Sequence, residues 1–142
     1  MRIRRLTIDD YDRITSLWER AALPYRPKGR DSKSAIESQM KKNPNFFLGA
    51  YDGNRLVGTV IAGYDYRRGW INRLAVDPKY RQKRVAQKLI AAAEKALRKM
   101  DARIICALVD DCNVASLSLF KKCGYMEHHD IVYFSKRDSN EV

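Results

Sequence analysis

The segment from Val76 to Ile90, VDPKYRQKRVAQKLI, limits the possible folds more than any other part of the chain. It begins at the end of an apolar run that reads as a strand and stops at Asp77-Pro78, because proline lacks the N–H group that a strand donates. From Val85 onward, apolar residues recur with helical spacing. The segment therefore predicts the end of a strand, a basic turn and an amphipathic helix in direct succession.

Further strands and helices are predicted on both sides of this segment. Apolar and β-branched runs predict strands over Met1–Leu6, Phe46–Tyr51, Leu56–Tyr64, Trp70–Val76, Arg103–Val109 and Met126–Phe134. Capping residues and helical spacing predict helices after Thr7, after Ser32 or Ser34, over Val85–Met100 and after Asn113. The order β-α-α-β-β-β-α-β-α-β indicates an α/β fold (an α+β mixed sheet) with helices on both faces. We expect a single domain over residues 1–142, with a frayed tail at 135–142.

Composition is that of a soluble globular protein, with 45% hydrophobic and 32% charged residues. The opening residues MRIRRLTIDD contain no apolar run like a signal peptide, and no stretch is long enough to span a bilayer. The three cysteines include no C-x-x-C pair, which argues against a metal site or a disulfide framework. We therefore expect a cytoplasmic protein with no metal and no membrane contact.

The net charge of +11 favours anionic partners and speeds their arrival. Nucleic acid, an acidic protein and a polyphosphate cofactor all fit this charge, which cannot choose among them. The basic segments YRPKGR and KYRQKR are accompanied by no helix-turn-helix, RNP or zinc pattern. Nucleic acid is therefore the least supported of the three.

The predicted helix start at Val85 is a suitable anion site. A helix start exposes unpaired N–H groups and the positive end of the helix dipole, where phosphate binds readily. Arg81, Lys83 and Arg84 add positive charge there, and Ala86 keeps the helix start narrow. These residues alone leave two interpretations open, a phosphate cradle and a solvated basic helix start.

Two motifs in register resemble the GNAT superfamily of N-acetyltransferases. Residues 76–86 are similar to its acyl-CoA-binding signature, V-x-P-x-x-R-x-x-G-x-A. Residues 113–125, NVASLSLFKKCGY, resemble the second signature, N-x-x-A/S-x-x-L-Y-x-K-x-G-F/Y. The resemblance extends over nearly the whole chain, and two motifs with matching element order make coincidence improbable.

The resemblance implies a coenzyme A site and a reaction in which an amine attacks the acetyl thioester directly. Backbone groups of the 81–86 loop would hold the pyrophosphate, and the preceding strand would pair with the pantetheine arm and polarise the thioester carbonyl. The helix after Asn113 would form the opposite wall. The implied cofactor-binding residues are Leu74, Ala75, Val76, Arg81, Gln82, Lys83, Arg84, Val85, Ala86, Asn113, Ser116 and Phe120.

Two residues depart from the family pattern at the cofactor site. Arg84 occupies the place of a family glycine, which allows close approach to phosphate and an unusual φ. A left-handed φ at a residue other than glycine costs on the order of 1 kcal/mol or more. Phe120 stands where many relatives have a tyrosine that protonates the leaving thiolate, so water or another group must supply that proton.

The general base is not evident from the sequence. Where relatives have a glutamate in the strand over residues 103–109, this chain has Leu108, and Asn72 and Arg73 replace an acidic residue of the third strand. Deprotonating a lysine amine at pH 7 costs roughly 4–5 kcal/mol, and an α-amine only about 1 kcal/mol. The site therefore suits an amine of low pKa or has a base elsewhere. Weak candidates, each with an ordinary surface or hairpin role as the alternative, are Asp65, Tyr66, Glu19, Tyr64 and Tyr25.

The leading hypothesis is an acetyl-CoA-dependent N-acetyltransferase that acts on a primary amine of a small molecule, peptide or protein. Arg84 and Phe120 also permit a weakly active or non-catalytic acyl-CoA-binding module. Little sequence follows Phe134, so the outer wall of the acceptor pocket is undefined, and a homodimer could complete it.

Overall fold

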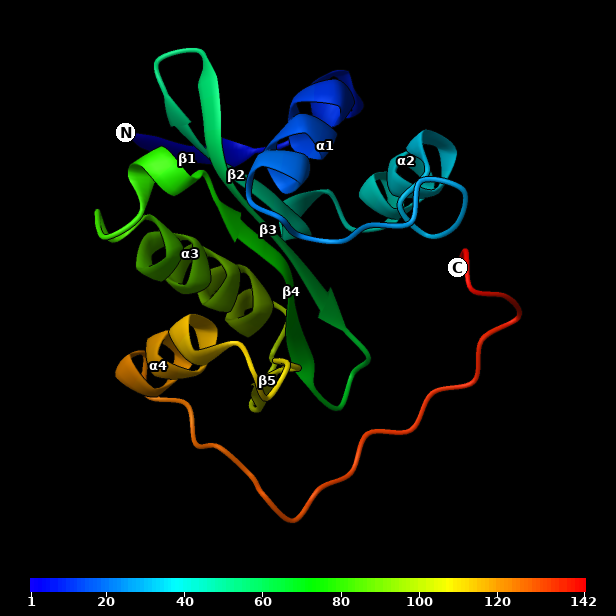
Figure 1. Cartoon of the computed structure of the whole chain (residues 1–142), viewed down its shortest axis with the longest axis vertical. Coiled ribbons are helices and arrows are strands. Elements are labelled where there is room, and N and C mark those ends of the chain that lie inside the picture. The colour runs from blue at the N-terminus through cyan, green and yellow to red at the C-terminus, as the bar shows by residue number, and fades with distance from the viewer.

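The computed structural model describes all 142 residues and is built around a five-stranded sheet with the order β1-β2-β3-β4-β5 (Figure 1). The strands are β1 (Arg2–Arg5), β2 (Phe47–Asp52), β3 (Arg55–Tyr64), β4 (Gly69–Val76) and β5 (Ile105–Ala107). The α-helices are α1 (Tyr11–Arg20), α2 (Lys33–Lys42), α3 (Val85–Lys99) and α4 (Val114–Lys122). Short 3-10 turns η1 (Ile8–Asp10), η2 (Pro44–Phe46) and η3 (Pro78–Tyr80) precede α1, β2 and α3.

The sheet is mixed, as the sequence predicts. Strands β1 to β4 are antiparallel neighbours, whereas β5 runs parallel to β4. Helices α1 and α2 lie on one face and α3 on the other, with α4 beside α3 (Figure 1). The α/β class with a mixed sheet and helices on both faces is confirmed.

Helix α3 packs against β2, β3 and β4 through the apolar stripe that its sequence predicts. Gly58 and Gly69 allow this close approach, because a Cβ atom at Gly58 would lie 2.8 Å from a Leu89 methyl carbon and one at Gly69 would lie 2.9 Å from a Leu97 methyl carbon. The helix predicted over Val85–Met100 ends at Lys99, and Met100 is exposed.

Two strand predictions need correction. The strand predicted over Arg103–Val109 forms only from Ile105 to Ala107 and is half-buried, because β4 pairs with it over three residues alone. The strand predicted over Met126–Phe134 does not form. Its backbone N–H and C=O groups would need a sheet edge to pair with, but after α4 the chain runs away from the sheet in a long arc (Figure 1).

The arc ends beside the loop before α2. Glu141 forms an ion pair of 3.8 Å with Lys28, and the end of the chain lies against Gly29. The tail at 135–142 therefore lies close to the N-terminal helices, although its residues are mostly exposed.

Candidate active site

The start of α3 has unpaired backbone donors. The first helical bond runs from the Lys88 N–H to the Arg84 carbonyl oxygen at 3.1 Å, and no side chain caps the helix. The N–H groups of residues 85–87 therefore have no acceptor in the protein, and the positive end of the helix dipole lies beside them. This arrangement can bind an anion, as the sequence predicts.

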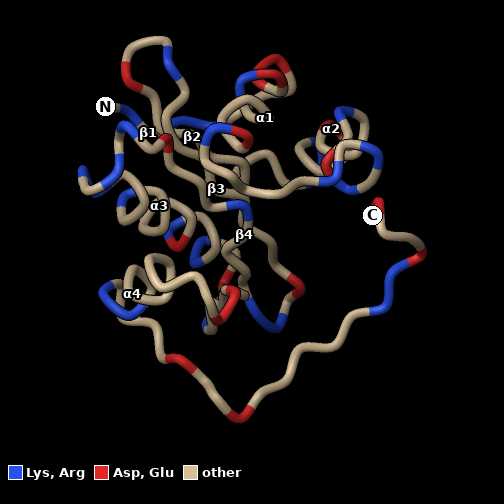
Figure 2. Tube along the Cα trace, in the orientation of Figure 1, with Lys and Arg blue, Asp and Glu red and all other residues tan.

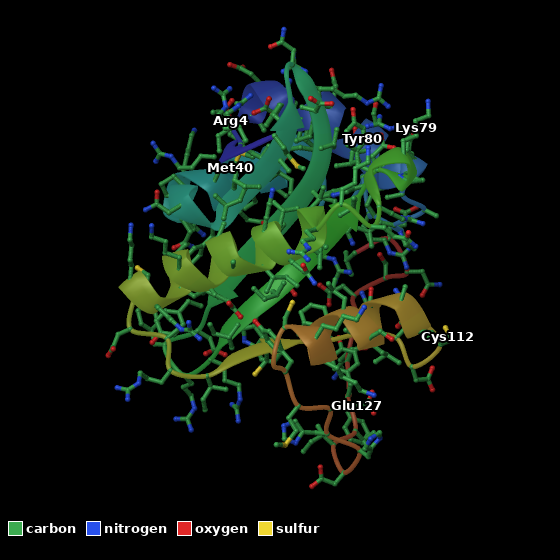
Figure 3. All side chains as sticks on the ribbon, turned by 90° about the vertical axis from the view of Figure 1, so that its left-hand side faces the viewer. Arg4, Met40, Lys79, Tyr80, Cys112 and Glu127 are labelled. Carbon is green, nitrogen blue, oxygen red and sulfur yellow. The ribbon has the colours of Figure 1, made fainter.

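Positive charge surrounds these donors. Lys and Arg residues are concentrated on the loop that leads into α3, where the tube is mostly blue (Figure 2). The ammonium of Lys83 lies 5.2 Å from the centre of the Tyr80 ring, a cation–π contact. Lys79 and Tyr80, on the η3 turn, and Cys112, which precedes α4, lie toward the same side of the view, with Cys112 lower (Figure 3).

Asp77 holds the turn before this loop in place. Its carboxylate is 2% exposed, accepts a hydrogen bond from the Lys79 N–H at 2.9 Å, and pairs with Arg20 at 3.1 Å and Arg55 at 3.0 Å. Burial on its own raises the pKa of Asp77, but the hydrogen bonds from Lys79, Arg55 and Arg20 outweigh it, so the pKa lies below its usual range. A buried carboxylate thus anchors the end of β4.

Arg84 adopts a left-handed backbone conformation that favours glycine. Its φ of 63° and ψ of 19° are left-handed, and Gln82 also has a positive φ of 62°. The Arg84 side chain is exposed, so it points away from the core. Because a residue other than glycine holds this left-handed conformation, the backbone of the loop is strained at Arg84.

Strands β4 and β5 separate beyond their short pairing. The last pair is Ile71 with Ala107, whereas β4 continues to Val76. A cleft of about 490 Å³ opens at this point. Its lining residues come from β4, from the segment after β5, from α4, from the loop before α2 and from the C-terminal tail.

The structure brings the predicted cofactor residues together in two groups. Leu74, Asn113, Ser116 and Phe120 line the cleft. Residues 81–84 form an exposed loop beyond the end of β4, and α3 starts at Val85, which is buried, and Ala86, which is half-buried. Between them, Ala75 is buried and Val76 half-buried in the strand. The Asn113 side chain caps α4 by accepting a hydrogen bond from the Ser116 N–H at 3.2 Å.

Phe120 is both a core residue and part of the cleft wall. It is 9% exposed and contacts Tyr125 edge-to-face, with ring centres 5.1 Å apart. The Tyr125 hydroxyl donates to Glu94 at 2.6 Å. Burial and this bond raise the pKa of Tyr125, so its proton is held firmly.

None of the weak catalytic candidates lines the cleft. Asp65 is a turn residue that accepts hydrogen bonds from the N–H groups of Arg67 and Arg68, which lower its pKa. Tyr66 is 81% exposed and its ring contacts that of Tyr64 at a tilted angle. Glu19 accepts a hydrogen bond of 2.7 Å from the Tyr25 hydroxyl. Each of these contacts is structural.

Two residues that the sequence did not single out for the cleft line it, Asp31 and Arg73. Asp31 is 3% exposed, and its carboxylate accepts the Arg26 N–H at 2.8 Å. Arg73 lies in a bulge of β4 with a left-handed φ of 52°. The only sequence signal for Asp31 is that it is a single acidic residue at the end of the basic run from Arg26 to Arg30. No sequence signal marks the β4 bulge at Arg73.

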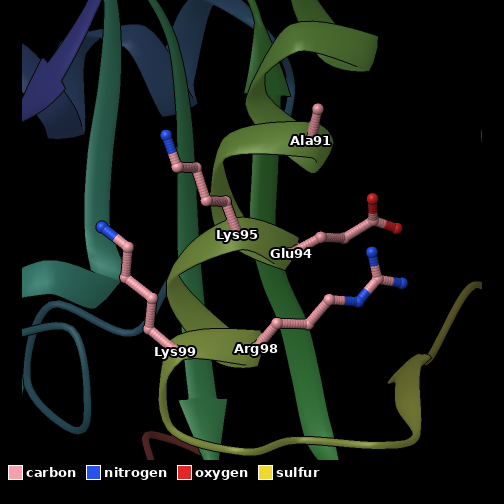
Figure 4. Close-up of a pocket in the computed structure, with 5 residues that line it drawn as sticks. All are labelled: Ala91, Glu94, Lys95, Arg98 and Lys99. Atoms are coloured by element: carbon pink, nitrogen blue, oxygen red, sulfur yellow. The ribbon is translucent and has the colours of Figure 1, made fainter.

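A second hollow, of about 530 Å³, has only one wall. Its lining side chains project outward from α3 alone: Ala91, Glu94, Lys95, Arg98 and Lys99 (Figure 4). A site enclosed by one helix face cannot surround a ligand, so the cleft is the better candidate. No group of His, Cys, Asp and Glu side chains is arranged to hold a metal ion.

A family model described as the acetyltransferase (GNAT) family matches residues 11–125, which include the α3 loop and α4. The chain belongs to the GNAT acetyltransferase family. It is an acyltransferase, as its two motifs predict. This GNAT chain is 36% identical over 138 residues to an acetyltransferase of Photorhabdus laumondii, covering 96% of this chain and 95% of the relative.

Solved structures share the GNAT fold at low sequence identity. The PaiA N-acetyltransferase of Thermoplasma acidophilum, in complex with coenzyme A, has a TM-score of 0.75 at 20% identity over 85% of this chain and 86% of its own. The aminoglycoside acetyltransferase AAC(6′)-Iy, bound to a bisubstrate analogue, has a TM-score of 0.77 at 17% identity over 96% and 97%. No helix of this GNAT protein combines the length and apolar character needed to cross a membrane.

Proposed function

We propose that the protein is an acetyl-CoA-dependent N-acetyltransferase that acetylates a primary amine of a small molecule, peptide or protein. The observation that carries this proposal is the continuity of two features along β4. The strand first lines the cleft at Leu74 and then leads into the unpaired N–H groups at the start of α3. A ligand with phosphates at one end and a reactive group at the other fits this arrangement.

The free donors of the chain fit coenzyme A. The unpaired amides of residues 85–87, with the surrounding Arg81, Lys83 and Arg84, would hold the pyrophosphate. The part of β4 beyond its pairing with β5 has an open edge that would bind the pantetheine amides. The coenzyme A complexes among the structural neighbours support this assignment.

Acetyl-CoA, when bound, would supply an acetyl thioester that the amine attacks directly in a ternary complex. The chain's own contribution is to align the reactants between β4 and α4 and to present backbone N–H groups of β4 toward the thioester carbonyl. Phe120 has no proton to donate, so water would protonate the leaving thiolate. Asp31 and Asp110 supply the carboxylates that line the cleft. These carboxylates can orient the acceptor amine or accept its proton through water.

The free cysteines Cys106, Cys112 and Cys123 suit a reducing compartment, so we propose that the reaction takes place in the cytoplasm.

An acceptor screen tests the proposed function. Release of coenzyme A from acetyl-CoA would be followed with α-amino acids, peptides, polyamines and aminoglycosides, together with a thermal-shift assay for binding. Turnover with at least one amine is expected. A thermal shift by acetyl-CoA without turnover of any amine would instead support a non-catalytic binding module.

The variant Phe120→Tyr adds the hydroxyl that many relatives have at this position. If protonation of the thiolate limits the rate, this variant should raise kcat about 10-fold or more without changing the affinity for acetyl-CoA. Tyr125→Phe is the matched control, because the Tyr125 hydroxyl donates its proton to a hydrogen bond with Glu94 and Tyr125 does not line the cleft. An equal effect of both substitutions on kcat would contradict the placing of Phe120 at the thiolate.

A further inference from the structure

We propose that the acceptor carries a carboxylate next to its amine, as an α-amino acid does, and that Arg73 binds this carboxylate. The inference rests on the proposed function, since it concerns the acceptor of that reaction. It starts from Arg73, which lines the cleft and has two buried guanidinium nitrogens without hydrogen-bond partners.

Arg73 is held in place by buried contacts. It lies in the bulge of β4, where its carbonyl oxygen accepts a hydrogen bond of 3.1 Å from the Thr59 hydroxyl. The same hydroxyl accepts a bond of 3.0 Å from the indole N–H of Trp18. Trp18 and Thr59 are fully buried, and the guanidinium carbon of Arg73 lies 4.3 Å from the centre of the Trp18 ring. The backbone and the side chain of Arg73 are therefore both fixed.

The unpaired atoms of Arg73 have the geometry of a carboxylate site. Nε and Nη2 are buried and have no acceptor in the protein. These two nitrogens form one edge of the planar guanidinium, and two parallel N–H groups on one edge match the two oxygens of a carboxylate. Buried donors without partners destabilise a fold, so their retention at a cleft indicates that a ligand supplies the acceptors.

The surroundings of Arg73 suit a zwitterion. Arg30 and Arg137 also line the cleft and add positive charge around the same space. Asp31 lines it too, and no ion pair joins Asp31 to Arg73, although each influences the other electrostatically. One oxygen of Asp31 accepts the Arg26 N–H, and the other accepts no hydrogen bond from the protein. An acceptor with a carboxylate at Arg73 and an amine facing Asp31 would satisfy both groups.

The experiment compares acceptors that differ only in charge. Each standard α-amino acid would be paired with its carboxamide, and kcat and KM measured for the full chain by coenzyme A release. The preferred amino acid should exceed its amide in kcat/KM by roughly 10- to 100-fold, the range expected of a charge-assisted bond pair. This preference would oppose intrinsic reactivity, because the amine of the amide loses its proton more readily.

The variant Arg73→Met keeps the packing on Trp18 but removes the donors. It should abolish the preference by raising KM for the amino acid and should leave the amide unaffected. Arg4→Met is the matched control, since Arg4 also lies over an aromatic ring, 3.9 Å from the centre of Tyr51, but is outside the cleft. The proposal is overturned if the wild type does not favour carboxylates, or if Arg73→Met impairs both substrates equally, as a purely structural role would require.

A binding measurement tests the carboxylate site even if the proposed acetyltransferase activity is not found. If polyamines or aminoglycosides are acetylated and amino acids are not, the enzyme is an acetyltransferase and the carboxylate site is refuted. If no amine is acetylated, calorimetric titration of the coenzyme-A-loaded protein with the amino acids and amides still decides the question. Tighter binding of an amino acid that Arg73→Met abolishes supports the site, and equal binding of acid and amide refutes it.

Discussion

At the scale of single residues, Arg84 and Asp77 shape the loop that leads into α3. Arg84 holds a left-handed φ of 63°, which favours glycine, and Asp77 is a buried carboxylate that ties the turn to two arginines. The first residue strains the loop and the second anchors it. Both effects can be measured separately.

Arg84→Gly should raise the free energy of unfolding by about 1 kcal/mol, because glycine adopts this φ without a steric penalty. Arg81→Gly is the matched control: it removes the same charge from the same loop, but Arg81 has an ordinary φ of −68°. The control should lower stability by about 0.5 kcal/mol through the added freedom of the unfolded chain. Urea denaturation of both variants checks this, and equal changes would show that the strain at Arg84 is negligible.

Asp77→Asn removes the ion pairs with Arg20 and Arg55 and should destabilise the protein by about 2 kcal/mol at neutral pH. The loss is modest because both arginines are partly exposed, which weakens each ion pair. The folded-state pKa of Asp77 is depressed, so its stabilising effect is present above the unfolded pKa of about 4 and is lost as pH falls through the lower folded value. Urea unfolding at several pH values should show the difference between wild type and variant shrinking below about pH 4. A difference independent of pH would contradict the assignment of charge to Asp77.

At the scale of elements, α3 links the core to the anion site. Its inner residues pack on the sheet where glycines remove side chains, and its first N–H groups face the loop. The position of the helix start therefore depends on the packing beneath it. The two ends of α3 can be disturbed independently.

Gly58→Ala should destabilise the fold by about 1–2 kcal/mol, because the added methyl group would lie 2.8 Å from Leu89 and 3.0 Å from Val85. Gly69→Ala should have a similar effect on stability through Leu97, at the far end of the helix. Only Gly58→Ala should also weaken coenzyme A binding, since it displaces the helix start. Calorimetric titration with coenzyme A checks this, and equal losses of affinity would mean that α3 moves as one rigid rod.

At the scale of the whole molecule, the C-terminal tail connects α4 to the N-terminal half of the chain. Tyr133 and Arg137 line the cleft, and Glu141 lies beside Lys28 and Gly29. The tail thus forms part of the outer boundary of the candidate acceptor site without belonging to the sheet. Its attachment should be local and easily broken.

Gly29→Ala should release the tail, because the added methyl group would lie 2.5 Å from the Glu141 carbonyl oxygen and 2.7 Å from the Val142 Cα. Trypsin should then cleave more quickly after Lys136 and Arg137, while global stability changes little. Lys28→Met removes only an exposed ion pair and should leave the cleavage rate nearly unchanged. Unaltered cleavage in Gly29→Ala would show that Gly29 does not hold the tail.

The sequence alone determined what depends on local chemistry. The helices after Thr7 and from Val85 and the caps at Ser32, one of two candidate serines, and Asn113 follow from spacing and from residue type, and each is present in the structure. The family and the loop into α3 were predictable for the same reason, since both motifs are contiguous.

Tertiary structure decided everything that needs distant segments to meet. The predicted strand over Met126–Phe134 fails because strand formation requires a neighbouring edge, which no local pattern can guarantee. The cleft exists because β4 and β5 separate after Ile71, and Asp31 and Arg73 face it because a loop reverses on Arg26 and a bulge turns the strand. Burial, and with it the unpaired state of the Arg73 guanidinium, is a property of the packed chain and cannot be read from any single segment.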